Sequence, residues 1–157
     1  MMKIEFILND KAQTIDVHPA RRLLDLLRED FGLTSVKEGC GEGECGACVV
    51  LMNGKAVNSC LVPAGNIIGN SIQTLEGFKT TERYKVIEKC FLEAGSVQCG
   101  FCTPGIVMAT ESLLNENPNP TDKEIKEGLA GNLCRCTGYN MIFKGIRLAA
   151  ERGKGLW

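Results

Sequence analysis

The chain has 157 residues, of which 24% are charged and 44% hydrophobic, and its formal net charge is −1. Neither half gathers the lysines and arginines that a nucleic-acid-binding face requires, so the composition argues against that class of partner. The apolar run Ile4–Leu8 is interrupted by Glu5 and is too short for a signal peptide or a membrane span. A cytoplasmic location is therefore expected.

The nine cysteines are the most informative feature of the composition. Thiols stay reduced in the cytosol, so nine cysteines in a chain of this size indicate metal binding rather than disulfides. Their spacing divides them into two sets of four and a single one. The single one, Cys90, falls on the apolar face of an expected helix and is interpreted as a small buried hydrophobic residue.

The chain opens with two expected strands and a helix. Ile4–Leu8 and Ile15–Val17 alternate in polarity around an Asn-Asp turn, which predicts a hairpin. Leucines at helical spacing predict a helix over Arg21–Phe31, and Gly32 stands where a C-terminal capping glycine belongs. The one histidine, His18, follows the second strand and is expected in an exposed turn rather than as a metal ligand.

The stretch EGCGEGECGACVV, residues 38–50, contains most of the first cysteine set. Its three cysteines are separated by four and then two residues, and a fourth follows after eleven more. This C-x4-C-x2-C…C pattern is the plant-type spacing for a 2Fe–2S cluster, and glycines between the cysteines let the backbone approach sulfur closely. Zinc remains the alternative, although the distant fourth ligand favours iron–sulfur. The candidate ligands are Cys40, Cys45, Cys48 and Cys60.

A predicted hairpin explains the distant fourth ligand. Asn-Gly between apolar runs favours a type I′ turn, and pairing of Met52 with Lys55 would place Cys60 opposite Ala47, next to Cys48. Neighbouring strands lie about 5 Å apart, so the hairpin returns the fourth cysteine to the loop.

One more strand is expected around Ile72, Thr74 and Leu75. Together these elements predict an α+β fold whose first part, residues 1–78, is a plant-type ferredoxin-like (β-grasp) domain. Its core is thin, so the cluster is expected to stabilise the domain as well.

Helical patterns follow, and residues 79–157 are expected to form an all-α four-helix-bundle domain. Apolar residues at helical spacing, with Ala94 as the last, mark its first helix. Capping residues and prolines mark the helix starts that follow. These expected starts are Thr103 as a cap with Pro104 at the first position, the capping box Thr121–Glu124, and Thr137 or Gly138.

The second cysteine set lies at the ends of these expected helices, in VQCGFCTPG and GNLCRCTGY. A C-x2-C pair and a C-x-C pair give four thiolates, and the positive ends of two helices could face an anionic cluster. Zinc could use this spacing as well, but the neighbouring first set favours a second iron–sulfur cluster. The candidate ligands are Cys99, Cys102, Cys134 and Cys136.

The three cysteine motifs, in this order and over nearly the whole chain, resemble the iron–sulfur subunit of the molybdenum hydroxylases. That family includes xanthine dehydrogenase, aldehyde oxidoreductase, carbon monoxide dehydrogenase and nicotinate dehydrogenase. Val49 stands where many members have threonine, but it is not a ligand. The chain has no room for the flavin and molybdenum domains fused onto some members, so the resemblance implies a separate small subunit.

The resemblance implies roles for particular residues. The set around Cys45 would hold the 2Fe–2S cluster nearer the flavin, and the set around Cys102 the one nearer the molybdenum. Gln98 matches the glutamine that hydrogen-bonds the molybdopterin, although the residue alone could equally satisfy a loop backbone. Cys136 matches the ligand whose vicinity touches the pterin amino group.

The implied function is electron transfer. A large molybdenum-binding subunit would hold the molybdopterin and oxidise substrate, and an FAD-binding medium subunit would receive the electrons. No catalytic acid, base or nucleophile is assigned to this chain, because the cofactors supply the chemistry. A diffusible two-cluster carrier and a zinc-stapled interaction module are the alternatives. The sequence does not indicate the substrate.

Overall fold

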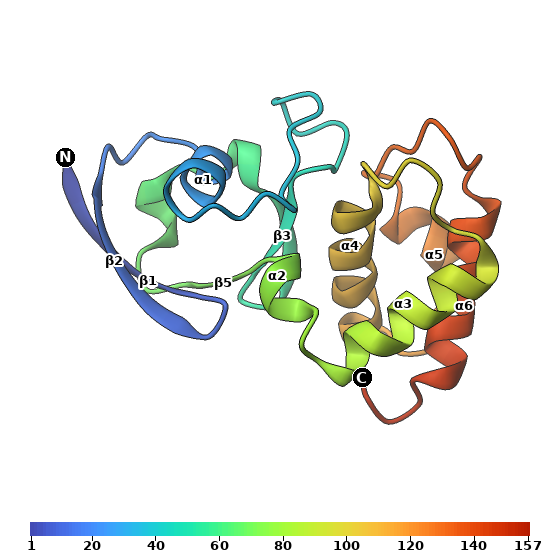
Figure 1. The fold of residues 1–157 in the computed structure, drawn as a ribbon. Helices are drawn as coiled ribbons and strands as arrows, with labels where there is room; N and C mark the ends of the chain where they lie inside the picture. Colours follow the sequence, from blue (N-terminus) through green and yellow to red (C-terminus); the bar gives the residue numbers. More distant parts are fainter.

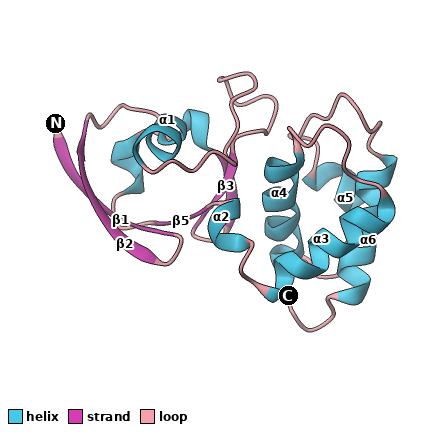
Figure 2. Cartoon of the chain, in the orientation of Figure 1, coloured by secondary structure: helices cyan, strands magenta, loops and turns pink.

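The structure, a computed structural model, describes residues 1–157. A single five-stranded sheet has the strand order β2-β1-β5-β3-β4, with β1 and β5 parallel and the other neighbours antiparallel. Figure 2 shows that the strands occupy one side of the molecule and most helices the other. The strands are β1 (Met2–Leu8), β2 (Lys11–Val17), β3 (Val49–Met52), β4 (Lys55–Asn58) and β5 (Ser71–Gln73).

Six α-helices complete the fold, and α1 runs directly into a π-helical turn, Leu26–Asp30. In Figure 1, α1 lies against the sheet, whereas α3 to α6 form a separate group that meets the sheet where α4 faces β3. The predicted α+β fold, a ferredoxin-like part followed by helices, is confirmed. The helices are α1 (Leu23–Asp25), α2 (Leu75–Phe78), α3 (Glu82–Ala94), α4 (Thr103–Glu116), α5 (Asp122–Gly128) and α6 (Asn140–Arg152).

The predicted hairpins are confirmed. In the first, Leu8 pairs with Lys11 across a turn whose two residues both have positive φ. In the second, Met52 pairs with Lys55 and Val49 with Asn58, which is the expected register. His18 lies exposed after β2, as predicted.

Two predicted boundaries were wrong. The helix begins at Leu23 rather than Arg21, because residues 21–23 bond to the chain that follows β4: the Arg21 carbonyl accepts from the Ala64 N–H, and the Leu23 N–H donates to the Val62 carbonyl, both at 2.8 Å. The last strand ends at Gln73, not Leu75. Thr74 turns the chain there, since its carbonyl accepts from the N–H groups that open α2.

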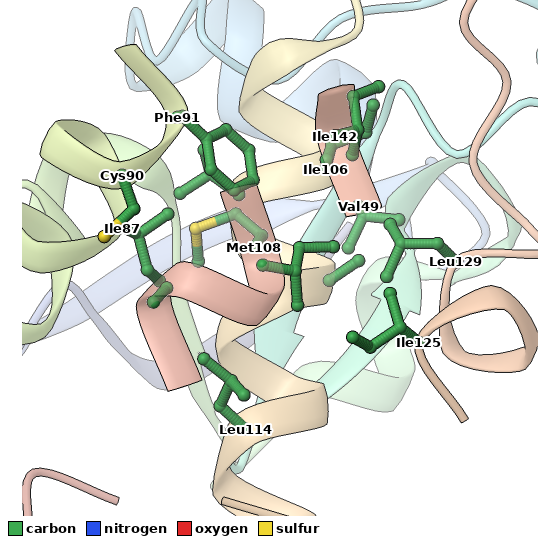
Figure 3. Packing of buried hydrophobic residues seen from close by; sticks show 14 of the residues in the cluster. Val49, Ile87, Cys90, Phe91, Ile106, Met108, Leu114, Ile125, Leu129 and Ile142 are labelled. Carbon is green, nitrogen blue, oxygen red and sulfur yellow. The ribbon is translucent and has the colours of Figure 1, made fainter. Parts of the chain in front are cut away.

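Two hydrophobic cores share β3. Val50 belongs to the core between the sheet and α1, and Val49 and Leu51 on the opposite face belong to the core of the helices. Figure 3 shows Val49 in the same cluster as Ile106 of α4 and Leu129, which follows α5. Strand β3 is therefore buried on both faces, as its uninterrupted apolar sequence allows.

The helical part is as expected in its main features. The side chain of Thr121 and that of Glu124 form the predicted capping box of α5, and Cys90 is fully buried on α3. No helix in the chain is both long enough and apolar enough to cross a lipid bilayer.

A buried carboxylate ties the C-terminus to α4. Glu111 is 0% exposed. Its carboxylate forms an ion pair with Arg83 at 3.1 Å and accepts a hydrogen bond from the Trp157 indole N–H at 2.8 Å. Removing one partner of a buried charge leaves that charge uncompensated. The Arg83–Glu111 pair should therefore contribute to stability more than the surface ion pairs do.

We expect Arg83→Met to lower the free energy of unfolding by about 2 kcal/mol, because Arg83 is the only cation on Glu111 and is itself partly exposed. Lys85→Met is the control, since the Lys85–Glu82 pair lies in solvent and should contribute almost nothing. Denaturation midpoints followed by circular dichroism compare the two. Equal midpoints would show that Arg83 does not hold the buried carboxylate.

Candidate metal centres

The first cysteine set is assembled by the long loop before β3 and by the β3–β4 hairpin. Cys40 and Cys45 lie on the loop, and Cys48 immediately precedes β3. After Asn58 the chain leaves the strand ladder and makes a 3-10 turn, Ser59–Leu61, which carries Cys60. The Ser59 hydroxyl donates to the Cys48 carbonyl at 2.8 Å, so Cys60 lies beside Cys48 as predicted, although in a turn rather than in the ladder.

Backbone donors surround the exposed end of this set. The N–H groups of Glu42 and Glu44 lie 3.5 and 3.3 Å from the Cys40 sulfur. Together with the Cys45 N–H they lower the pKa of the Cys40 thiol to about 7. At the inner end, the pKa of Cys60 is raised to about 11, mainly by burial and secondly by the neighbouring Cys48 thiol. The loop therefore stabilises negative charge on sulfur at its outer end.

The second set is assembled by two loops of the helical part. Cys99 and Cys102 lie just before α4, and Cys134 and Cys136 lie between α5 and α6. The sulfur atoms of Cys99 and Cys136 are 3.6 Å apart. The pKa of Cys102 is raised to about 12, mainly by burial and secondly by the neighbouring Cys134 thiol.

Cys134 has the opposite shift. Burial acts to raise its pKa, but hydrogen bonds from Thr137 and from the Cys136 N–H outweigh burial and lower it. The Thr137 hydroxyl lies 3.1 Å from the Cys134 sulfur, and the Cys134 N–H donates to the Tyr139 hydroxyl at 3.0 Å. The second set thus also has a protein-supplied hydrogen-bond donor at one sulfur.

The helix starts beside this set differ from those predicted. Cys102 itself is the N-terminal cap of α4, so Thr103 is the first helical residue and does not cap. The last helix begins at Asn140, after two residues of positive φ, Gly138 and Tyr139. These two residues turn the chain before the helix can start, which explains why the predicted start at Thr137 or Gly138 was too early.

The cysteines of each set meet in pairs. Cys40 lies with Cys45 and Cys48 with Cys60 in one set, and Cys99 lies with Cys136 and Cys102 with Cys134 in the other. No group of three or more His, Cys, Asp or Glu side chains surrounds one point. Metal–sulfur bonds of about 2.3 Å at a tetrahedral metal place two sulfurs about 3.8 Å apart. Two such pairs are the donor set that a 2Fe–2S cluster takes, one pair for each iron.

The two sets face a common apolar cavity of about 340 Å³. Cys45 of the first set lines it together with all four cysteines of the second set, and Ala47, Phe101 and Leu133 complete much of the wall. In Figure 1 the loop before β3 and the two loops that carry the second set all lie at the upper edge of the molecule. The tertiary structure thus brings the two sets next to each other.

The most exposed cysteines belong to the second set. Cys99 and Cys136 are exposed, next to the exposed Gln98, whereas Cys134 is buried. In the first set no cysteine is fully exposed, since two are half-buried and two are buried. Large apolar side chains lie exposed around the second set, with Phe101 48% and Leu133 55% accessible. Sequence reasoning missed this apolar rim, although both residues are direct neighbours of predicted ligands.

Comparisons with known proteins agree with this geometry. Residues 6–66 match the family model described as a 2Fe-2S iron-sulfur cluster binding domain, and residues 74–147 match the model described as a [2Fe-2S] binding domain. The nicotinate dehydrogenase small FeS subunit of Eubacterium barkeri is 54% identical over 149 residues, 95% of each chain. The xanthine dehydrogenase iron-sulfur-binding subunit of Escherichia coli O157:H7 is 49% identical, covering 96% of this chain and 95% of that protein.

Solved structures give the same result. Quinoline 2-oxidoreductase from Pseudomonas putida 86 contains a chain that superposes with a TM-score of 0.90 at 41% identity, covering 98% of this chain and 96% of that one. Aldehyde oxidoreductase from Desulfovibrio gigas superposes with a TM-score of 0.91 at 32% identity, but there this chain covers only 18% of the longer protein.

A two-part chain with a cysteine quartet in each part is an iron–sulfur electron-transfer protein. The chain belongs to the iron–sulfur small subunits of the molybdenum hydroxylases. It is accordingly the electron-transferring component of an oxidoreductase, and it binds two 2Fe–2S clusters.

We expect the purified protein to be brown and to contain about four iron and four labile sulfide per chain. Cys45→Ser or Cys102→Ser should each lose about half of the iron, because each removes a ligand of one cluster. Cys90→Ser is the control and should keep all of it, since Cys90 is buried on α3 and belongs to neither set. Elemental analysis with visible spectroscopy measures the content, and stoichiometric zinc in a colourless protein would contradict the assignment.

Proposed function

We propose that this chain conducts electrons from a molybdopterin site on a large partner subunit to FAD on a medium partner subunit. The set Cys40, Cys45, Cys48 and Cys60 would hold the cluster nearer the flavin, within a domain of residues 1–78. The set Cys99, Cys102, Cys134 and Cys136 would hold the cluster nearer the molybdenum, within a domain of residues 79–157. We place the complex in the cytoplasm.

The observation that carries this order is the exposure of the second set. Cys99 and Cys136 reach the surface beside Gln98, inside a rim of exposed apolar side chains. Exposed apolar area around a reactive centre is typical of a surface that another protein covers. We assign this surface to the molybdenum subunit, with Gln98 as a hydrogen-bonding partner of the pterin and Cys136 close to its amino group.

The clusters supply one-electron chemistry, and the residues of this chain hold them and adjust their charge. Backbone N–H groups around Cys40 and the Thr137 hydroxyl at Cys134 stabilise negative charge on sulfur. The apolar cavity beside Cys45 is lined by all four cysteines of the second set, so it provides the space in which the second cluster would sit. The chain contributes no acid, base or nucleophile to substrate oxidation.

Partner content provides the first test. We expect the native protein to copurify with a molybdenum-binding subunit and a flavin-binding subunit, through interfaces of more than about 1,000 Å². Size-exclusion chromatography with metal and nucleotide analysis of the native complex measures this. A free monomer that reduces a soluble acceptor would instead support the diffusible carrier.

The order of the clusters is tested by Cys45→Ser in the assembled complex. Substrate should still reduce the molybdenum and the C-terminal cluster, seen by their paramagnetic signals, whereas flavin reduction should slow drastically because the remaining gap is long. Gln98→Ala should instead slow reduction of the C-terminal cluster by substrate and leave the N-terminal cluster reducible from the flavin. A normal rate of flavin reduction in the Cys45→Ser complex would overturn the order.

A further inference from the structure

The segment before Cys134, residues 131–133, is hydrogen-bonded directly to the N-terminal cysteine loop. The Leu133 N–H donates to the Cys45 carbonyl at 2.9 Å. One residue earlier, the Asn132 side-chain amide donates to the Gly46 carbonyl at 3.2 Å. Two successive residues of one cysteine loop are therefore bonded to two successive residues of the other.

The contact leaves no room at Gly46. A Cβ atom there would lie 2.5 Å from the Asn132 amide nitrogen and closer still to the Gly131 carbonyl. On the other side, a Cβ atom at Gly105 of α4 would collide with the Gly46 carbonyl. Gly46 also has φ +70°, a conformation that favours glycine. The end of the first cysteine loop that leads into β3 is thus enclosed between α4 and the segment before Cys134.

Asn132 is the polar side chain that closes this contact. It is 6% exposed, and its own N–H is bonded to the Leu129 carbonyl at 3.0 Å at the end of α5. The carbonyl that it binds also accepts from the Val49 N–H at 3.3 Å, at the start of β3. Loss of the Asn132 amide would leave the Gly46 carbonyl with one donor fewer in a buried place.

We propose that Asn132 is a positioning residue for electron transfer between the two clusters. Its amide holds the Cys45–Gly46 backbone against residues 131–133, and this contact maintains the hydrogen bond from Leu133 to Cys45. Cys45 is a ligand of one set and Leu133 directly precedes Cys134, a ligand of the other. The shortest bonded connection between the sets therefore runs through the Cys45 carbonyl and the Leu133 N–H.

The inference rests on the proposed function, because it requires both clusters to be bound at the assigned cysteines. In the step concerned, one electron leaves the C-terminal cluster, which is oxidised by one unit, and enters the N-terminal cluster, which is reduced by one unit. No bond is made or broken and no proton moves. The Asn132 side chain donates its hydrogen bond to the backbone carbonyl of Gly46 and not to a cysteine sulfur. It therefore acts through the backbone that it holds.

The test uses the complete complex, reduced with dithionite, and two readouts. The first is the magnetic splitting that two reduced clusters impose on each other's paramagnetic signals. The second is hydrogen exchange of the Leu133 amide, followed by mass spectrometry. Asn132→Ala and the similarly shaped Asn132→Asp should keep their iron, reduce the splitting, and speed Leu133 exchange by roughly fivefold, the effect of one lost buried hydrogen bond.

Asn70→Ala is the matched control. The Asn70 amide also donates to a backbone carbonyl, that of Asn66 at 3.0 Å, but in the turn before β5. This variant should leave both the splitting and Leu133 exchange as in the unmodified protein.

The outcomes separate the two proposals. If the unmodified complex lacks one of the two cluster signals, the proposed function fails. If both signals are present but the Asn132 variants match the unmodified protein in splitting and exchange, only the role of Asn132 is overturned. If Asn132→Ala fails to bind clusters, hydrogen exchange of the Leu133 amide in the unmodified complex tests the role of Asn132. Fast exchange there would exclude the hydrogen bond on which the inference depends.

Discussion

The burial of β3 on both of its faces is the constraint on which the rest of the structure depends. One face places Val50 in the core with α1, and the other places Val49 and Leu51 in the core with α3 to α6. Separating the two parts would expose one of these faces to water, at about 25 cal/mol for each Å² of apolar surface. The Ala56 N–H of β4 adds a bond across the junction to the Ser112 hydroxyl of α4 at 3.0 Å. The two cysteine sets are therefore held at a fixed separation.

This rigidity matters because the chemistry of the molecule depends on distance. Cys48 sits at the first position before β3, and Cys102 caps α4, which packs on that strand. A cysteine of each set is thus attached to one of the two elements that form the junction. Electron transfer over a fixed gap requires no motion, and a shared strand provides the fixed gap more directly than a flexible linker would.

The chain stabilises negative charge at its sulfurs mostly without cationic side chains. Backbone N–H groups approach Cys40, and a hydroxyl approaches Cys134. The Arg22 guanidinium is near the first loop but is neutralised by Asp25 and Glu38 at 2.7 Å each. Fixed dipoles act at short range, so each can adjust one sulfur without creating a charged surface. Arg135, exposed between Cys134 and Cys136, is the cation nearest to the second set along the chain.

The sequence by itself determined the features that depend on neighbours along the chain. The Asn-Gly turn fixed the register that returns Cys60 to Cys48, the Thr121–Glu124 pattern fixed the start of α5, and cysteine spacing predicted both candidate ligand sets. The tertiary structure alone decided the contacts between distant segments. The start of the first helix at Leu23, whose N–H bonds to the Val62 carbonyl, and the enclosure of Gly46 by Asn132 each depend on groups far away in the sequence. No local pattern carries that information, because such contacts form only when distant segments pack together.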